Sequence, residues 1–345
     1  MTNVRMAIAI SMCVIVALAG CAKDAPVVPA DAPPVSTPTA GTVPPVDYST
    51  TPDQLFDADC AALFTSAEVE TVMGSAMPAS TSPFTFPVIQ SAGLECTWGS
   101  DEIGTDGSVL NVVVLPAVTV PTAVDGQTCI VDNNGPGAFG WCVFTALSHG
   151  LVLSGTVSIA VGSTKADAEA ALRRLLPVFE SRAANAASPD IREPSADAWP
   201  ATVDCERLEE LAGIRALLGG PTMKLYQVDI DGYFKPAIAL LGAGHDWSEC
   251  SWQDYVGSSS GNDFVGATIF ADGLWAKDRL AAGGVSTKVA GADEAFRVTM
   301  DGGEGPSEII VVVVGNNVMT VAPAWQPLDG ILPTVPVLIT ALNAM

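Results

Sequence analysis

The chain has 345 residues, of which 15 are Lys or Arg and 38 are Asp or Glu, giving a net charge of −23. This acidic balance argues against nucleic acid and anionic lipid headgroups as partners held by charge. A hydrophobic content of 49% is ample for buried cores, and the length suits two domains of about 150 residues.

The N-terminus has the three parts of a secretory signal: a positive charge at Arg5, an uncharged apolar run over residues 6–19, and small residues before Cys21. The run is shorter than the roughly 20 apolar residues that span a bilayer. Its ending, LAGC, is similar to the lipobox of bacterial lipoproteins. That resemblance implies that residues 1–20 are a signal peptide and that Cys21 carries a diacylglyceryl group. Two acyl chains anchor stably, so we expect the mature chain at the outer face of the cytoplasmic membrane.

Residues 21–54 follow the anchor and are rich in Pro, Ala, Thr and Val, with no helical or strand period. Such a composition favours extended polyproline II and predicts a semi-rigid tether. Cleavage removes one Arg and no acid, which leaves 14 basic and 38 acidic side chains and a net charge of −24. The charge serves solubility and self-repulsion at a crowded cell surface or, alternatively, attracts a positively charged partner.

A duplication organises the rest of the chain. Residues 59–74 align without gaps on residues 204–219, with similar helical apolar spacing and a final glycine that suits a helix C-cap. Further on, a Glu-Cys-Thr-Trp motif that ends at Trp98 returns as Glu-Cys-Ser-Trp ending at Trp252. The predicted organisation is a first copy over residues 55–183, a linker over 184–203 and a second copy over 204–345.

Each copy is predicted to be an α+β domain, with an antiparallel sheet flanked by an N-terminal and a C-terminal helix. The closing helix of the first copy begins at a capping box formed by Thr164 and Asp167. Pro177 and Pro336 are expected to kink or break the closing helices. The later strands are expected at Val109–Leu115, Gly140–Leu147, Leu151–Val161, Phe264–Phe270, Ala295–Met300, Glu308–Val314 and Val318–Ala322.

Six cysteines remain once the signal is removed and Cys21 is lipidated, and an even number outside the cytoplasm indicates disulfides. If the copies fold alike, the repeated cysteines pair within each copy, and the two cysteines unique to the first copy pair with each other. The predicted bonds are Cys60–Cys96, Cys205–Cys250 and Cys129–Cys142.

The combination of an exported cysteine, a Pro-rich spacer, Asp-x-Cys-x-x-Leu before a helix and a later Cys-x-Trp strand resembles an uncharacterised domain of actinobacterial surface lipoproteins. This family implies a location and no established activity. Its members are single copies, so a doubled domain is a departure. The resemblance rests on Cys60, Cys96 and Trp98 in the first copy and on Cys205, Cys250 and Trp252 in the second.

Catalytic motifs are weak in this sequence. A GSSSG segment matches the G-x-S-x-G pattern of a serine nucleophile at Ser259, but it lies between two strands and not before a helix. The two histidines, His149 and His245, are expected to be exposed turn residues. No Cys-x-x-Cys pair occurs and the chain has only two histidines, which argues against a zinc site. No metal site and no cofactor are predicted. Trp98 and Trp252 are expected to pack against the disulfides, with contact to a ligand as the alternative.

We therefore expect a non-enzymatic binding or interaction protein of the cell envelope. Its partner would be the membrane, through the lipid on Cys21, together with an envelope protein or a small extracellular ligand. One alternative is an envelope hydrolase that uses Ser259. Another is an extracellular sensor input that acts through a separate receptor.

Overall fold

The computed structural model describes residues 46–80, 86–99, 108–120, 123–132, 139–219, 223–227, 247–254, 264–302, 305–323 and 327–345. The predicted signal peptide, Cys21 and most of the tether lie outside the described residues, as do Ser259 and His245. No helix in the described part of the chain is both long and apolar enough to cross a bilayer.

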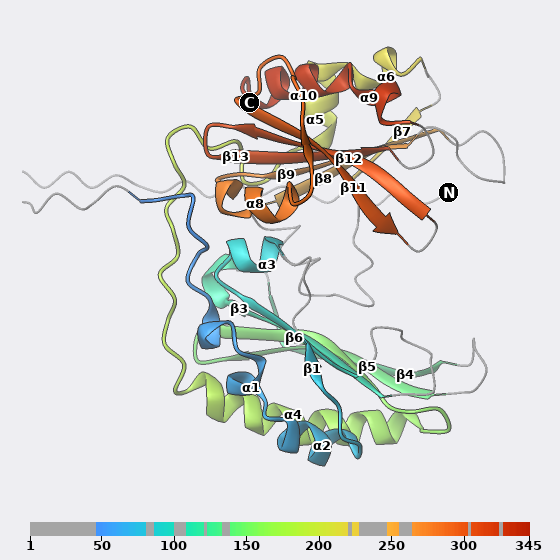
Figure 1. The fold of residues 1–345 in the computed structure, drawn as a ribbon. Coiled ribbons are helices and arrows are strands. Elements are labelled where there is room, and N and C mark those ends of the chain that lie inside the picture. The colour runs from blue at the N-terminus through green and yellow to red at the C-terminus, as the bar shows by residue number, and fades with distance from the viewer. Residues whose placement is uncertain are drawn as a thin grey trace, which may run out of the picture. The chain divides into compact units, whose positions relative to one another are not determined.

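The fold is α+β and contains two antiparallel sheets, as Figure 1 shows. The first sheet has six strands in the order β1-β2-β3-β6-β5-β4. They are β1 (Ala79–Ser80), β2 (Leu94–Gly99), β3 (Val109–Pro116), β4 (Gly126–Asp132), β5 (Phe139–Ser148) and β6 (Leu151–Ser158).

The second sheet has seven strands in the order β10-β11-β12-β13-β9-β8-β7. If β10 is set aside, this order repeats that of the first sheet strand for strand, with β8 and β2 carrying the two Cys-x-Trp motifs. The strands are β7 (Met223–Gln227), β8 (Trp247–Asp254), β9 (Phe264–Phe270), β10 (Val285–Ser286), β11 (Glu294–Gly302), β12 (Gly305–Val314) and β13 (Asn317–Pro323).

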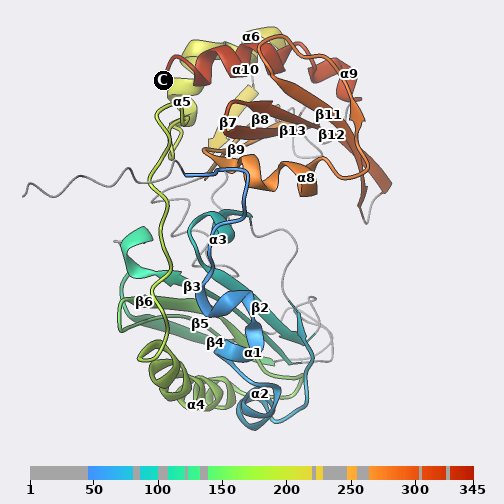
Figure 2. The same ribbon diagram turned by 60° about the vertical axis from the view of Figure 1, so that its left-hand side comes forward.

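Helices lie on both faces of each sheet in both views: most lie along one face, whereas α3 (Phe86–Gln90) and α8 (Lys277–Leu280) lie on the opposite face of their sheets (Figures 1 and 2). In the first half of the chain they are η1 (Leu55–Ala58), α1 (Cys60–Leu63), α2 (Ser66–Met73), α3 (Phe86–Gln90), η2 (Ala117–Thr119) and α4 (Lys165–Ala183). In the second half they are α5 (Cys205–Ala212), α6 (Ile214–Leu217), η3 (Gly273–Ala276), α8 (Lys277–Leu280), α9 (Leu328–Ile331) and α10 (Thr334–Leu342).

The helical segments at 59–74 and 204–219 are each divided in two, whereas their apolar spacing predicts one helix. In the first segment, Thr65 begins α2 with a capping box, accepting from the backbone N–H of Glu68 while the Glu68 side chain accepts from the Thr65 N–H. In the second segment, Gly213 adopts a left-handed conformation with a φ of 61°, which ends α5. Local capping at different positions therefore overrides the shared period.

The two prolines affect their helices differently. The expected break at Pro177 is absent, because α4 runs from Lys165 to Ala183 with Pro177 inside it. The second closing helix is divided, but the division falls between α9 and α10. Pro336 lies in the first turn of α10, where a missing backbone N–H costs little. The capping box of Thr164 and Asp167 at the start of α4 is confirmed.

Two of the three apolar cores join each sheet to the helices on its face. In the first core, Leu172, Leu175 and Phe179 of α4 lie with Leu110 and Val112 of β3. In the second, the α10 side chains pack with strand residues, and two residues of the 184–203 segment, Trp199 and Val203, are buried among them.

A third cluster draws on the opposite faces of both sheets. In β3, Val113 and Leu115 belong to it, whereas the alternate residues belong to the first core. In β12, Val311 and Val313 belong to it, and the residues between them to the second core. Burial on both faces explains why these strands read as unbroken apolar runs and not as alternating ones.

Candidate functional site

The three predicted disulfides are present, as Cys60–Cys96, Cys129–Cys142 and Cys205–Cys250. Each helix-to-strand bond follows an aspartate that caps the helix. The Asp59 carboxylate accepts from the Ala61 N–H, and the Asp204 carboxylate accepts from Glu206 and Arg207. The Asp-x-Cys motif therefore starts a helix and ties its first residue to the sheet.

The two tryptophans are core residues, each 0% exposed. This burial leaves neither indole a surface from which to contact a ligand, so the alternative of ligand-contact aromatics is not supported. Trp98 meets the ring of Phe64 edge to face, with centroids 5.8 Å apart. Trp252 instead donates its indole N–H to the Glu209 carboxylate at 2.8 Å.

The motif residues beside the tryptophans point to the other face of the sheet, because side chains alternate along a strand. In the first copy this places Glu95 and Thr97 together, both buried. The Asn111 amide donates to the Thr97 hydroxyl at 2.8 Å and to the Glu95 carboxylate at 3.4 Å. In the second copy burial raises the pKa of Glu249. The Glu-Cys-Thr/Ser-Trp motif thus builds an apolar face and a polar face at once.

A groove of about 1010 Å³ lies between the segment that leads into α1 and the end of α4, at the upper end of the range typical of small-molecule sites. One wall is the segment from Thr51 to Ala58 together with Ala62, and the other runs from Arg182 at the end of α4 through Asn185 to Asp190. The sequence pattern does not predict these residues as a site, because no motif marks them.

The first wall contains an unusual turn. Phe56, Asp57 and Ala58 have φ angles of 55°, 52° and 59°, so three successive non-glycine residues are left-handed. Such a conformation costs roughly 1–2 kcal/mol per residue. Anchors on both sides hold it: the buried Leu55 donates its N–H to the Ala92 carbonyl at 3.0 Å, and Asp59 begins the stapled helix α1.

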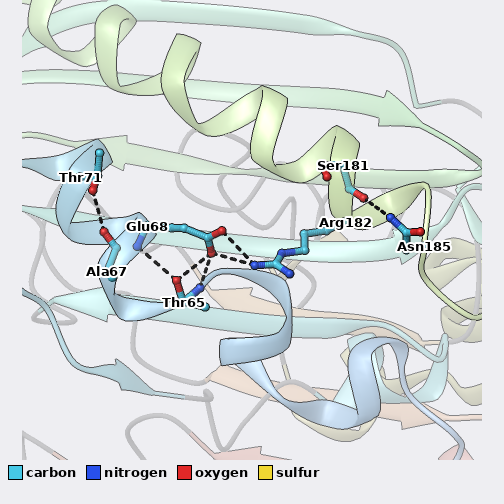
Figure 3. A network of polar contacts seen from close by, with 7 residues as sticks. All are labelled: Thr65, Ala67, Glu68, Thr71, Ser181, Arg182 and Asn185. Carbon is cyan, nitrogen blue, oxygen red and sulfur yellow. Dashed lines mark hydrogen bonds and ion pairs between the residues drawn. The ribbon is translucent and has the colours of Figure 1, made fainter.

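The second wall is fixed by an ion pair between helices, drawn in Figure 3. The Arg182 guanidinium donates to both Glu68 carboxylate oxygens, at 2.9 and 3.2 Å. Burial works to raise the pKa of Glu68, but hydrogen bonds from Thr65 and Arg182 outweigh it and lower the pKa. Asn185 continues the wall, donating its side-chain amide to the Ser181 carbonyl. The groove side of α4 is therefore held in place.

Residues 48–51, which lead into the first groove wall, form hydrogen bonds with residues 192–193 of the segment between the two copies. The Tyr48 hydroxyl donates to the Glu193 carbonyl at 2.7 Å. Arg192 donates to the Thr50 carbonyl at 2.7 Å and to the Thr51 carbonyl at 3.0 Å. Both segments are consequently part of the folded unit at this point, although their Pro-rich composition predicts a tether and a linker.

The charged side chains of the groove are mainly acidic. Asp53, Asp57 and Asp190 line it, and its Arg182 is paired with Glu68. The arrangement therefore favours a cationic group over an anionic one. Within the described residues, no group of three or more His, Cys, Asp or Glu side chains has a metal-binding arrangement.

His149 lies in the exposed two-residue turn between β5 and β6, with positive φ at His149 and Gly150. Its Nδ1 contacts the Ser148 hydroxyl at 2.8 Å. The expectation that His149 is an exposed turn residue is confirmed. Ser259, the nucleophile of the hydrolase alternative, and the second histidine, His245, lie outside the described part of the chain.

No protein-family model and no curated protein matches the chain. Among solved structures, it is similar to the di-domain ARO/CYC StfQ from the steffimycin biosynthetic pathway, with 11% identity, a TM-score of 0.16 and coverage of 82% of this chain and 86% of that one. It is also similar to DynU16, a putative protein in the dynemicin biosynthetic locus, with 11% identity, a TM-score of 0.13 and coverage of 78% and 94%. Likeness at this level bears neither on fold nor on function.

Proposed function

We propose that the protein is a membrane-anchored, extracytoplasmic binding protein without enzymatic activity, and that the groove between residues 51–62 and 182–190 is its ligand site. The observation that carries the proposal is the left-handed turn of Phe56, Asp57 and Ala58 in the groove wall. Backbone strain of this kind persists where the surrounding structure enforces it, and it concentrates at ligand sites. Here a disulfide and an ion pair hold the two walls before any ligand arrives.

The proposed anchor is a lipid on Cys21, placed by the signal over residues 1–20. The three disulfides support this address, because such bonds persist in oxidising compartments. If it is correct, Cys21→Ser abolishes incorporation of a labelled fatty acid and releases the protein from the membrane fraction. Labelling that survives the substitution would refute the anchor.

The proposed architecture behind this site is two tandem related domains, over residues 55–183 and 204–345, each with an N-terminal and a C-terminal helix on its sheet. The matching strand orders and the equivalent disulfides support a duplication. The first copy alone has the left-handed turn among the described residues, so the groove is a specialisation of one copy.

The proposed ligand is a small or extended molecule with at least one cationic group, which pairs with Asp57 and Asp53. A charged pair at a partly exposed site contributes modestly, on the order of 1 kcal/mol. The rest of the affinity would come from hydrogen bonds to the polar residues of the walls. Amines of cell-envelope peptides have the required chemistry.

Titration of the complete, lipid-free chain with short lysine-containing peptides tests the site, with amide chemical shifts as the readout. We expect shifts confined to residues 51–62 and 182–190, and an affinity about 2-fold to 5-fold weaker for Asp57→Asn, in line with the loss of one exposed ion pair. Asp278→Asn is the matched control, because its side chain is 95% exposed in the other half of the chain. Equal losses in both variants would refute the site.

A further inference from the structure

Strand β4 forms one edge of the first sheet. It is seven residues long, from Gly126 to Asp132, and pairs with β5 on one side. Within the described residues no strand pairs with its other side. An edge of this kind presents backbone donors and acceptors to which another extended chain can add.

The disulfide across β4 and β5 shows which backbone groups face outward. Cys129 lies opposite Cys142, with the two Cα atoms 4.1 Å apart. That spacing belongs to a non-hydrogen-bonded pair, whose N–H and C=O groups point away from the neighbouring strand. The outward groups of β4 are therefore those of Gln127, Cys129 and Val131, since the pattern repeats every second residue.

The second copy closes the equivalent edge. Arg297 is the counterpart of Gln127 in the second copy. Gln127 pairs with Phe144, and Arg297 pairs with Ile310. Each of these partners lies five residues before the turn that ends its strand. In the second copy, however, β10 adds to this edge, with Val285 opposite Arg297. Arg297 also carries a charge there and pairs with Asp329.

Covering strands and charged side chains are the usual protection against unwanted pairing. Within the described residues no strand covers β4, and the only charged residue of β4 is its last one, Asp132. Gln127 and Thr128 are exposed, and Val131 retains 37% of its surface. The Cys129–Cys142 bond also holds β4 in register, so the open edge is preorganised.

We propose that β4 is a docking edge that receives an extended segment of a partner protein by strand addition. The idea rests on the proposed function as an interaction module and assigns it a second surface, separate from the groove. The partner segment is uncharged and β-branched at its centre, with Lys or Arg at its ends. Charge selects this occupant over a second copy, because two chains of net charge −23 repel each other and the exposed Asp125 precedes the strand.

The probe is the synthetic peptide Lys-Thr-Val-Thr-Val-Thr-Lys, with Glu-Thr-Val-Thr-Val-Thr-Glu as its charge-reversed counterpart. Each is titrated into the complete, disulfide-bonded chain, and binding is followed at the amide signals of residues 126–132, because the groove is also proposed to bind lysine-containing peptides. We expect the lysine-ended peptide to bind at least tenfold more tightly, and its amide signals to show the protection of a paired strand.

Two variants at one position separate the edge from its side chains. Gln127→Pro removes an outward N–H and leaves the hydrogen bonds between β4 and β5 in place, so binding falls at least tenfold. Gln127→Ala keeps the N–H, and binding stays within twofold. Near-ultraviolet circular dichroism verifies that both variants are folded.

Unchanged binding by Gln127→Pro would overturn the docking edge. Concentration-dependent dimers that Gln127→Pro abolishes, without binding of either peptide, would overturn the assigned partner and place a second copy there. If the peptide does not bind at β4 while the groove still binds its cationic ligand, the docking-edge proposal fails and the proposed function stands. If the groove fails and the edge binds, the ligand-site proposal fails alone.

Discussion

The two copies place a tryptophan beside equivalent disulfides but surround it differently. Phe64 in the first copy and Glu209 in the second occupy the same place in the aligned segments. Phe64 gives Trp98 an apolar neighbour, and the Trp98 indole N–H finds no acceptor among the described residues. Glu209 accepts from Trp252 and pairs with Arg215 at 3.1 Å. The same fold therefore accepts either an apolar or a charged side chain next to the buried tryptophan.

The same contrast continues at the surface. The second copy covers its sheet edge with β10, whereas no strand of the described residues covers β4 in the first copy, which has a disulfide across β4 and β5 instead. The first copy also forms the groove with the left-handed turn. If the two proposals hold, the first copy carries both binding surfaces and the second copy serves mainly as structural support.

The largest expected effects come from removing disulfides, and the size of each effect should follow the length of the loop that the bond closes. Replacing both cysteines of Cys205–Cys250 with Ala should lower the free energy of unfolding by about 4 kcal/mol, because the bond closes a loop of 45 residues. Removing Cys129–Cys142, with a separation of 13, should cost about 3 kcal/mol. Denaturant titration of the two variants gives both values. A larger loss of stability from removing the shorter loop would contradict this dependence on loop length.

The tryptophan environments give the next effect. Glu209→Ala leaves the Trp252 N–H without its acceptor and should destabilise the protein by about 2–3 kcal/mol. Glu209→Gln keeps an acceptor and should cost about half as much. Phe64→Ala in the other copy should cost about 3 kcal/mol through a cavity and not through an unpaired polar group. Similar losses for the Ala and Gln variants would show that the hydrogen bond contributes little.

Two glutamates should give opposite pH dependences. Burial raises the pKa of Glu249, so its contribution to stability is present at acid pH and is lost as the pH rises through the raised pKa. Glu68 has a lowered pKa, despite the opposing effect of burial, so its contribution is present at neutral pH and is lost on acidification. At neutral pH, Glu249→Gln should therefore raise the free energy of unfolding above that of the unsubstituted protein, and Glu68→Gln should lower it. Unfolding measured over a range of pH checks both.

The smallest effect concerns the groove turn. Glycine adopts a positive φ without the steric cost that alanine bears, so Ala58→Gly should stabilise the protein slightly, by less than about 1 kcal/mol. The same change should weaken ligand binding, because the turn becomes less rigid. Thermal unfolding and the peptide titration measure the two consequences, and a clear destabilisation would indicate that Ala58 is not strained.

The features that local chemistry determines were predictable from the sequence. Thr164 and Asp167 form their capping box, the repeated cysteines pair within each copy, and the strand Phe264–Phe270 has its predicted bounds. Strand β4 has no such signal, because its pairing with β5 depends on tertiary context. The left-handed turn at Phe56 is also unmarked, since non-glycine residues rarely adopt that conformation.

Hydrogen exchange of single amides tests the contrast between the copies most directly. In β4 the account predicts fast exchange at Gln127, Cys129 and Val131 and slow exchange at Thr128 and Ile130. In β11, Arg297 should be slow because β10 pairs with it. Uniform protection along β4, or an Arg297 amide that exchanges as fast as that of Gln127, would contradict an open edge in the first copy and a closed one in the second.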